Sequence, residues 1–400
     1  MTKRTTGRYE RTSVGGEEVA AFIPHPLPPA KPPIVIDAAL TERVRVAEQA
    51  LVRLELAGEM VPSLDWFIYA FVRKEAVLSS QIEGTQATLV DLLTFEAQEG
   101  GVEGAPPSAD VEEVCNYLDA LTFARAELAK PRGLPLSMRL LNKTHERLMR
   151  GVRGADKHPG DVRRSQNWIG GSRPGNAAYV PPPPHALGGV LGAFEKYMHG
   201  DGALPPLVRA ALLHVQFETI HPYLDGNGRI GRLLVTLLLE HWKLLTKPLL
   251  YLSLYFKRHR ADYYARLTAV RATGDWEGWL DFFLEGVATI AEEAVASARE
   301  LFALVAADRA RVLAHEGMSI VALRLFELLP RHPVVTVASV MKLVETTKPT
   351  AGRAIELLVT AGVLVETTGR KRDRSFVYRG YLDRLRVGTE LDVVRGRGAP

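Results

Sequence analysis

Apolar residues recur at every third or fourth position along most of the chain, and this periodicity predicts a mainly α-helical protein. Two helices are expected near the N-terminus, over residues 37–60 and 63–84, the second with Ser63 as its N-cap. The same pattern continues at residues 88–99, 111–128, 137–152, 187–200, 204–220, 229–245 and 248–294. Most of the polypeptide is therefore expected to form a helical bundle.

Two segments depart from this helical pattern. Residues 1–37 end in FIPHPLPPAKPP, and so many prolines predict an extended, polyproline-like arm. Residues 157–184 contain Gly170 and Gly171 between short β-type stretches, followed by a run of prolines. This second pattern predicts a β-hairpin.

The C-terminal region changes character again. Residues 319–380 predict a helix, a short helix, a turn, a helix and two strands, which is the order of a winged helix-turn-helix. Basic residues at the start of the third helix and in the strand loop suit DNA phosphates, although winged helices also dock on proteins. These residues are Lys348, Arg353, Arg370, Lys371, Arg372 and Arg374. We expect three domains, at residues 1–110, 111–300 and 301–400.

The composition is that of an ordinary globular protein, with 46% hydrophobic and 24% charged residues. A net charge of +4, from 50 basic and 46 acidic residues, is too small to indicate nucleic-acid binding by the whole chain. The single cysteine, Cys115, excludes an internal disulfide and a cysteine-based zinc site. No apolar run approaches the ~20 residues of a membrane span, and the N-terminus lacks a signal-peptide core. A soluble, cytoplasmic protein is expected.

Residues 221–232, HPYLDGNGRIGR, concentrate most of the candidate chemistry. Gly226, Gly228 and Gly231 fit the spacing G-x-G-x-x-G, but a helix precedes them where a dinucleotide-binding turn needs a strand. The acidic residue that such a turn needs about twenty positions downstream is also missing. A helix-loop-helix hairpin fits better, because glycines allow successive N–H groups to form an anion-binding nest at a helix N-terminus. A solvated turn between two helices is the simpler alternative.

The side chains of this stretch suit a polyphosphate. Arg229 and Arg232 lie one helical turn apart, so both can reach the same anion. Asp225 offers the hard oxygen ligand that a phosphate-bound Mg²⁺ prefers. His221 is a base near neutral pH and can accept a proton from a hydroxyl group.

The stretch resembles the signature of Fic-domain proteins, H-x-F-x-[DE]-G-N-G-R-x-x-R, with Tyr223 in place of the usual Phe. The resemblance implies a mainly α fold, namely a Fic-type helical bundle with a β-hairpin flap plus the C-terminal winged helix-turn-helix, with residues 111–300 as catalytic domain. It also implies that AMP is transferred from ATP to a Tyr, Thr or Ser hydroxyl of a target protein. The implied roles are proton acceptor for His221, Mg²⁺ ligand for Asp225, and phosphate binding for Gly226, Asn227, Gly228, Arg229 and Arg232.

Two further segments resemble parts of the same family. NWIGG followed by AYVPPPP is similar to the flap that pairs with the target as an added strand, and Ile169 and Gly170 are the expected edge. KRHRADYYARLTAVR is similar to the wall beside the adenosine, which makes Tyr263 and Tyr264 candidates for the base pocket. A covering loop and ordinary packing residues are the respective alternatives.

SSQIEGT, at residues 79–85, matches the inhibitory pattern [ST]-x-x-x-E-[GN] of the family through Ser79, Glu83 and Gly84. Residues four apart share a helix face, so Ser79 and Glu83 can point to one neighbour. The resemblance implies that Glu83 pairs with Arg232 in the place of the γ-phosphate. We therefore expect an autoinhibited protein adenylyltransferase that also modifies itself.

Two other functions remain open. One is a DNA-binding transcriptional regulator whose Fic domain only senses a nucleotide. The other keeps the enzyme but changes the donor or the direction of the reaction, so that Glu83 orients a water for AMP removal. ATP and an unidentified target protein are the expected partners. A homodimer, and docking of DNA or protein on the winged helix, also stay open, and no membrane is expected.

Overall fold

The computed structural model describes residues 4–59, 64–99, 108–200, 202–370 and 373–391. The chain divides into two compact units. The first comprises Met1–Glu55 and Asn116–Glu292, and the second Leu56–Cys115 and Glu293–Pro400. The division of the sequence at residues 110 and 300 stays a prediction.

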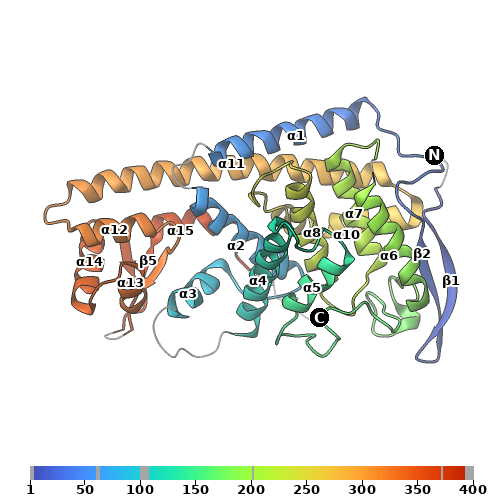
Figure 1. Cartoon of the computed structure of the whole chain (residues 1–400), viewed down its shortest axis with the longest axis horizontal. Helices are drawn as coiled ribbons and strands as arrows, with labels where there is room; N and C mark the ends of the chain where they lie inside the picture. The colour runs from blue at the N-terminus through green and yellow to red at the C-terminus, as the bar shows by residue number, and fades with distance from the viewer. Residues whose placement is uncertain (1–3, 60–63, 100–107, 201, 371–372, 392–400) are drawn as a thin grey trace, which may run out of the picture. The chain divides into compact units, whose positions relative to one another are not determined.

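The prediction of a mainly α-helical protein is confirmed (Figure 1). The helices are α1 (Ala38–Glu59), α2 (Leu64–Ile82), α3 (Leu89–Glu99), α4 (Ala109–Ala129), α5 (Met138–Leu148), α6 (Pro184–His199), α7 (Pro206–Ile220), α8 (Asn227–His241), α9 (Ser253–Arg258), α10 (Arg260–Thr273), α11 (Trp276–Ala314), α12 (Ile320–Leu328), α13 (Val337–Leu343), α14 (Lys348–Thr360) and α15 (Arg379–Leu385). The expected cap Ser63 lies outside the described residues.

The core of the first unit is built around α7 and α8, which pack against each other (Figure 1). Every residue of α7 from Leu207 to Ile220 is buried, polar ones included. A helix without an exposed face needs neighbours on every side, and for α7 these include α6, α8 and α10. The loop of residues 221–226 joins the end of α7 to the start of α8. The most chemically dense stretch of the sequence is thus fixed to the most buried helices of this unit.

The expected polyproline arm is wrong for residues 7–24, which form a β-hairpin. Strand β1 (Gly7–Val14) pairs antiparallel with β2 (Glu17–Pro24) through a two-residue turn, as Figure 1 shows. Gly15 and Gly16 both have positive φ, 57° and 84°, which is the backbone of a tight hairpin turn that glycine adopts without strain. The prolines that suggested an extended arm begin only at Pro24, where the hairpin ends.

The second unit combines α2 and α3 with the C-terminal elements. Its antiparallel sheet has the order β3-β5-β4, formed by β3 (Val334–Thr336), β5 (Ser375–Tyr378) and β4 (Leu364–Glu366). The order of helices and of the last two strands is as expected, and β3 is an additional short strand. The assignment as a winged helix stays a prediction, and Lys371 and Arg372 lie outside the described residues.

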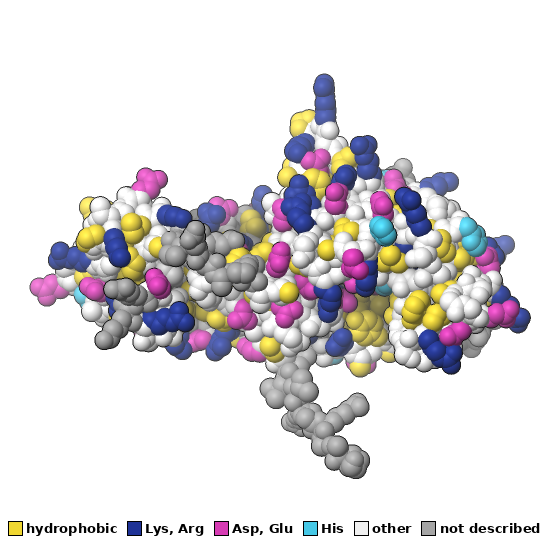
Figure 2. All heavy atoms as spheres, turned by 90° about the horizontal axis from the view of Figure 1, so that it is seen from below, with side chains coloured by type: hydrophobic (Ala, Val, Ile, Leu, Met, Phe, Trp, Pro, Cys, Tyr) yellow, Lys and Arg dark blue, Asp and Glu magenta, His cyan; other side chains and the backbone are white. Residues whose placement is uncertain are grey.

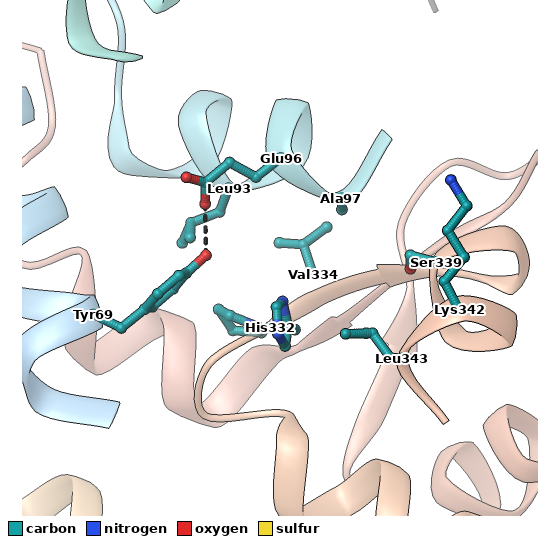
Figure 3. Close-up of a pocket in the computed structure, with 10 residues that line it drawn as sticks. Tyr69, Leu93, Glu96, Ala97, His332, Val334, Ser339, Lys342 and Leu343 are labelled. Carbon is teal, nitrogen blue, oxygen red and sulfur yellow. Dashed lines mark hydrogen bonds between the residues drawn. The ribbon is translucent and has the colours of Figure 1, made fainter. Parts of the chain in front are cut away.

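A hydrogen-bonded cluster links α2 to α3 beside a pocket of about 140 Å³ in the second unit (Figure 3). Tyr69 of α2 donates to the carboxylate of Glu96 on α3 at 2.5 Å, and Arg73 donates to the same carboxylate at 2.7 Å. His332 and Lys342 line the pocket from the C-terminal side. The helix that carries the SSQIEG stretch is therefore tied to α3, next to the C-terminal sheet.

Charged side chains of both signs are scattered over the face of the molecule in Figure 2. On the face shown in Figure 2, Lys and Arg side chains are interspersed with Asp and Glu side chains. Within the part of the chain that the structure describes, the helices are too short or too polar to cross a membrane.

Candidate active site

His221 is the C-cap of α7, directly after Ile220, and its backbone is left-handed, with φ 50° and ψ 62°. This conformation is uncommon for a residue with a side chain. It turns the chain out of α7 while the His221 N–H still donates to the Phe217 carbonyl at 2.9 Å. The imidazole is thereby presented at the start of the loop rather than along the helix.

Arg163 holds this turn in place, and sequence reasoning missed it. Its Nε donates to the His221 carbonyl at 2.9 Å, and its main-chain N–H donates to the Pro222 carbonyl at 2.9 Å. The other guanidinium nitrogens donate to the carbonyls of Ser165 at 3.2 Å and Pro182 at 2.5 Å. Burial lowers the pKa of Arg163 to about 10, which still leaves the guanidinium charged at neutral pH. One planar group therefore joins the His221 turn to both ends of the flap.

Asn227 closes the loop that follows. Its Oδ1 accepts from the Tyr223 N–H and its Nδ2 donates to the Tyr223 carbonyl, both at 2.8 Å. The Tyr223 ring is fully buried, and its hydroxyl donates to Asn142 Oδ1 at 2.8 Å. The phenol is thus satisfied, as a buried hydroxyl must be. The Asn227 side chain shapes the loop here, and its phosphate contact stays a prediction.

His145 of α5 supports the middle of the loop and is a second residue that the sequence did not reveal. Its ring stacks on Tyr223, with centroids 3.9 Å apart and planes 6° apart. Its Nε2 donates to the Asp225 carbonyl at 3.0 Å, and its Nδ1 accepts from the Gly160 N–H at 2.9 Å. Burial lowers the pKa of His145 to about 4, so the ring is neutral and its tautomer is fixed by these two partners. His145 therefore has a positioning role.

Asp225 directs a carboxylate out of the loop. Its Oδ1 accepts from the Gly226 N–H at 2.7 Å, and its Oδ2 contacts Lys157 Nζ at 3.1 Å. Burial raises the pKa of Asp225, but the hydrogen bonds from Lys157 and Gly226, with the nearby charge of Arg229, outweigh it and lower the pKa overall. Asp225 is therefore ionised and already has a cation beside it.

Gly226 is the N-cap of α8 and has a positive φ of 75°. A Cβ at this residue would lie 2.8 Å from Met149 Sδ and 3.2 Å from His145 Nε2, so only glycine fits. The first helical hydrogen bond of α8 runs from the Ile230 N–H to the Gly226 carbonyl at 3.1 Å. The N–H groups of residues 227–229 precede it and face the loop. N–H groups at a helix N-terminus can bind an anion, and the anion nest expected in this loop stays a prediction.

Both arginines of the motif lie inside the protein at this helix end. Arg229 is 1% exposed and Arg232 is 3% exposed. Arg229 Nη2 donates to Met149 Sδ at 3.4 Å. Two buried guanidinium groups therefore lie within the first two turns of α8.

The flap pairs through a single bridge, in which Ile169 and Tyr179 exchange N–H···O bonds of 2.8 and 3.0 Å. In such an antiparallel pair, the neighbouring residues present their N–H and C=O groups to the opposite side. The outward backbone groups thus belong to Trp168 and Gly170. The N–H of Trp168 is already bonded to Asn167 Oδ1 at 2.8 Å. The expected role of Ile169 and Gly170 as the edge that receives a target stays a prediction.

The flap is fixed on two sides. The Tyr179 hydroxyl donates to the Thr219 carbonyl of α7 at 2.7 Å. At its tip, Glu17 Oε2 accepts from Arg173 Nη1 at 2.9 Å and from the Gly175 N–H at 2.8 Å. The β1–β2 hairpin that the sequence did not predict therefore supports the flap.

The two candidates for the base pocket differ in their surroundings. Tyr263 is 1% exposed, stacks on Phe256 and has its hydroxyl 2.8 Å from His214 Nε2. Tyr264 is 41% exposed. Tyr263 thus packs in an aromatic core, whereas the ring of Tyr264 is exposed to solvent. The adenosine contact stays a prediction for both.

The SSQIEG stretch lies in the second unit. Ser79 is buried on α2, which ends at Ile82, so Glu83 stands one residue past the helix end. The Glu83 N–H donates to the Ser80 carbonyl at 3.0 Å, and Gly84 has a positive φ of 98°. Gln81 Nε2 donates to the Thr389 carbonyl at 2.8 Å. The stretch is therefore a helix end held by the C-terminal segment, and its inhibitory role stays a prediction.

Comparison with known proteins agrees with the motif. Residues 41–126 match the family model described as Fic/DOC family N-terminal, and residues 135–239 match the one described as Fic/DOC family. Two relatives named protein adenylyltransferase Fic, from Drosophila erecta and Drosophila willistoni, are each 30% identical over 161 residues. These residues are 40% of this chain and 30% of each relative, so the chain spans less than a third of their length.

A solved structure shows the same fold over a longer range. The crystal structure of a Fic family protein from Desulfovibrio desulfuricans G20 matches with a TM-score of 0.55 at 22% identity. The match covers 86% of this chain and 97% of that chain.

Proposed function

Since this chain belongs to the Fic/DOC family, we propose that it transfers AMP from ATP to a Tyr, Thr or Ser hydroxyl of a target protein. The observation that carries the proposal is the helix-loop-helix formed by α7, residues 221–226 and α8. It combines a histidine at the end of α7, an outward carboxylate, and two buried arginines at the N-terminus of α8. The name of the relatives, protein adenylyltransferase, supports the same chemistry.

The proposed step needs little covalent participation by the protein. The oxygen of the target hydroxyl attacks the α-phosphorus of ATP, the bond to the bridging oxygen breaks, and pyrophosphate leaves. His221 accepts the hydroxyl proton. The N–H groups of residues 227–229 and the guanidinium groups of Arg229 and Arg232 stabilise the negative charge on the phosphates. Catalysis here is positioning and electrostatic stabilisation.

The residues also fit a magnesium ion that arrives with the nucleotide. Within the described residues no group of three or more His, Cys, Asp and Glu side chains is suited to hold a metal. Mg²⁺ commonly uses one carboxylate together with substrate phosphates and waters. Asp225 is ionised, so its carboxylate would hold the ion in place of the Lys157 ammonium, which lies 3.1 Å from Oδ2. When bound, Mg²⁺ would neutralise phosphate charge.

We further propose that Glu83 restrains this reaction by competing with the γ-phosphate of ATP for Arg232. The carboxylate is half-buried, in the turn that follows α2. A carboxylate at a helix C-terminus is electrostatically unfavourable, so a cationic partner would stabilise it. Self-modification and a target protein are both proposed acceptors of AMP.

The proposed function is tested by comparing ATP labelled in the α-phosphate with ATP labelled in the γ-phosphate. A Glu83→Gly background removes the proposed brake. We expect covalent label on the protein, or on a protein of a cell lysate, only from the α-labelled nucleotide, and none after Mg²⁺ is removed with EDTA. Label from γ-labelled ATP would indicate phosphoryl transfer instead, and no label from either would contradict the proposal.

Arg163→Ala is expected to lower kcat of AMP transfer by about 10- to 100-fold, because a shift of His221 by ~1 Å misplaces the proton acceptor. The KM for ATP should change little, since the phosphate contacts are elsewhere. Arg163→Lys should not restore the rate, because an ammonium cannot reproduce the planar fork that bonds three carbonyls. Steady-state kinetics in the Glu83→Gly background measures both constants.

Arg164→Ala is the matched control, because the adjacent Arg164 side chain is 91% exposed. It should leave both constants unchanged. A thermal melt of each variant separates loss of positioning from loss of folding. Equal kcat for Arg163→Ala and the parent protein would show that the His221 turn does not depend on Arg163.

A further inference from the structure

Lys157 is placed against the carboxylate of the motif by a loop that is built for close approach. Its Nζ lies 3.1 Å from Asp225 Oδ2, although the two residues are 68 positions apart in the sequence. The Lys157 N–H donates to the Gly154 carbonyl at 2.9 Å, which folds the loop back toward Asp225. A Cβ on Gly154 would lie 2.9 Å from Asp225 Oδ2 and 2.8 Å from Met149 Cε. Only glycine at this point lets the loop bring Lys157 so near.

The carboxylate is oriented to receive this ammonium. Asp225 Oδ1 is occupied by the Gly226 N–H at 2.7 Å, so Oδ2 is the oxygen turned outward. The Asp225 side chain is 30% exposed and that of Lys157 is 46% exposed. An ion pair with this exposure contributes little to folding stability, and it can be exchanged at low cost. The Lys157–Asp225 ion pair is therefore a contact that a ligand can replace, and not one that holds the fold together.

Without a neighbouring cation, Asp225 would oppose nucleotide binding. The triphosphate of ATP carries several negative charges, and a bare carboxylate beside them is repelled by each. Arg229 and Arg232 are buried a short way along α8, but neither has the exposed position of Lys157 at Oδ2. The ammonium therefore neutralises Asp225 at the oxygen where a divalent cation would bind.

We propose that Lys157 is a resident cation of the nucleotide site, which neutralises Asp225 until a divalent cation displaces it. Nucleotide then binds without metal, and the metal ion takes over the charge of Lys157 when it arrives. This inference rests on the proposed nucleotide site and deepens it, because it assigns Lys157 a binding role. The expected signature is a Lys157 dependence of nucleotide affinity that is large without metal and small with metal.

The test measures binding of α,β-methylene ATP, which cannot donate AMP, by isothermal titration calorimetry of the full chain. The Glu83→Gly background is used so that the proposed brake does not limit binding. In EDTA, Lys157→Met should raise Kd by about tenfold, from the loss of one charge near a polyphosphate. In excess Mg²⁺, the same substitution should change Kd by less than about twofold, because the ion replaces the ammonium. Lys157→Arg keeps the charge and should stay near the parent in EDTA.

Two controls make the result specific. Lys143→Met removes an exposed lysine of α5 that pairs with Glu146, and it should change neither Kd. Adding Asp225→Asn to Lys157→Met should bring Kd in EDTA back near that of the parent, because the two substitutions together remove both charges of the pair. An equal loss of affinity with and without Mg²⁺, or a Lys157→Met/Asp225→Asn double variant that binds as weakly in EDTA as Lys157→Met, would overturn the inference. No change in EDTA would overturn it as well.

The same titration separates this inference from the proposed function. If no variant binds the analogue with Mg²⁺ present, the nucleotide site itself is wrong. If every variant binds it with the same affinity in EDTA, the nucleotide site stands and the role of Lys157 is wrong.

Discussion

Replacing His221 with Ala is expected to lower AMP transfer by about 10²- to 10⁴-fold, the range that a positioned general base contributes. The target hydroxyl would keep its proton during attack on the α-phosphorus, which makes it a poor nucleophile. ATP binding should persist, because the proposed phosphate contacts belong to the N-terminus of α8 and its buried arginines. Initial rates of α-³²P incorporation in the Glu83→Gly background measure the first effect, and calorimetry with α,β-methylene ATP the second.

His185→Ala is a suitable control for this experiment, because His185 lies near the start of α6 and its side chain is 67% exposed. It should transfer AMP at the parent rate. A His221→Ala protein that loses nucleotide affinity together with activity would indicate a collapsed loop rather than a missing base. Unchanged transfer by His221→Ala would mean that another group accepts the proton.

The helices were predictable because apolar residues recur at every third or fourth position along each of them. α1 and α8, for example, begin and end within a few residues of the expected positions. The β1–β2 hairpin was missed although its Gly15–Gly16 pair is a known type of hairpin turn. Most residues of β1 are polar, and the nearby prolines favoured an extended arm. Its packing against the flap, such as the 2.9 Å bond from the Phe22 N–H to the Val180 carbonyl, appears only in three dimensions.

The candidate site also has a part that the sequence indicated and a part that it did not. Its candidate side chains come from one continuous stretch, so their spacing and the resemblance to the Fic signature indicated them together. The groups that position them come from far away in the chain. Arg163 is 58 positions from His221, and His145 is 80 positions from Asp225. Neither lies in a recognisable pattern, because their partners are backbone carbonyls and N–H groups that any sequence can supply. The sequence indicates which candidate side chains the loop carries, but not which residues fix its shape.

Glu83→Gly is expected to raise the rate of AMP transfer by about tenfold or more, which corresponds to ~1.4 kcal/mol or more of restraint removed. The physical reason is competition. In the proposed resting state the Glu83 carboxylate engages the positive charge that the γ-phosphate of ATP requires, and glycine at this position leaves that charge to the nucleotide. Glu83→Gln should have a similar but smaller effect, since it removes the charge and keeps the volume. Incorporation of α-³²P label at several ATP concentrations measures the change.

Gln86→Gly is the matched control, because Gln86 is exposed in the loop that follows Gly84 and is not part of the [ST]-x-x-x-E-[GN] pattern. It tests whether added backbone freedom near the helix end is itself activating. If the Glu83 charge is the restraint, the gain should be largest at low ATP and shrink as ATP rises, because competition is relieved by mass action. A gain that is the same at all ATP concentrations would point to an effect on the chemical step instead. Equal rates for Glu83→Gly and the wild-type chain would contradict autoinhibition by this residue.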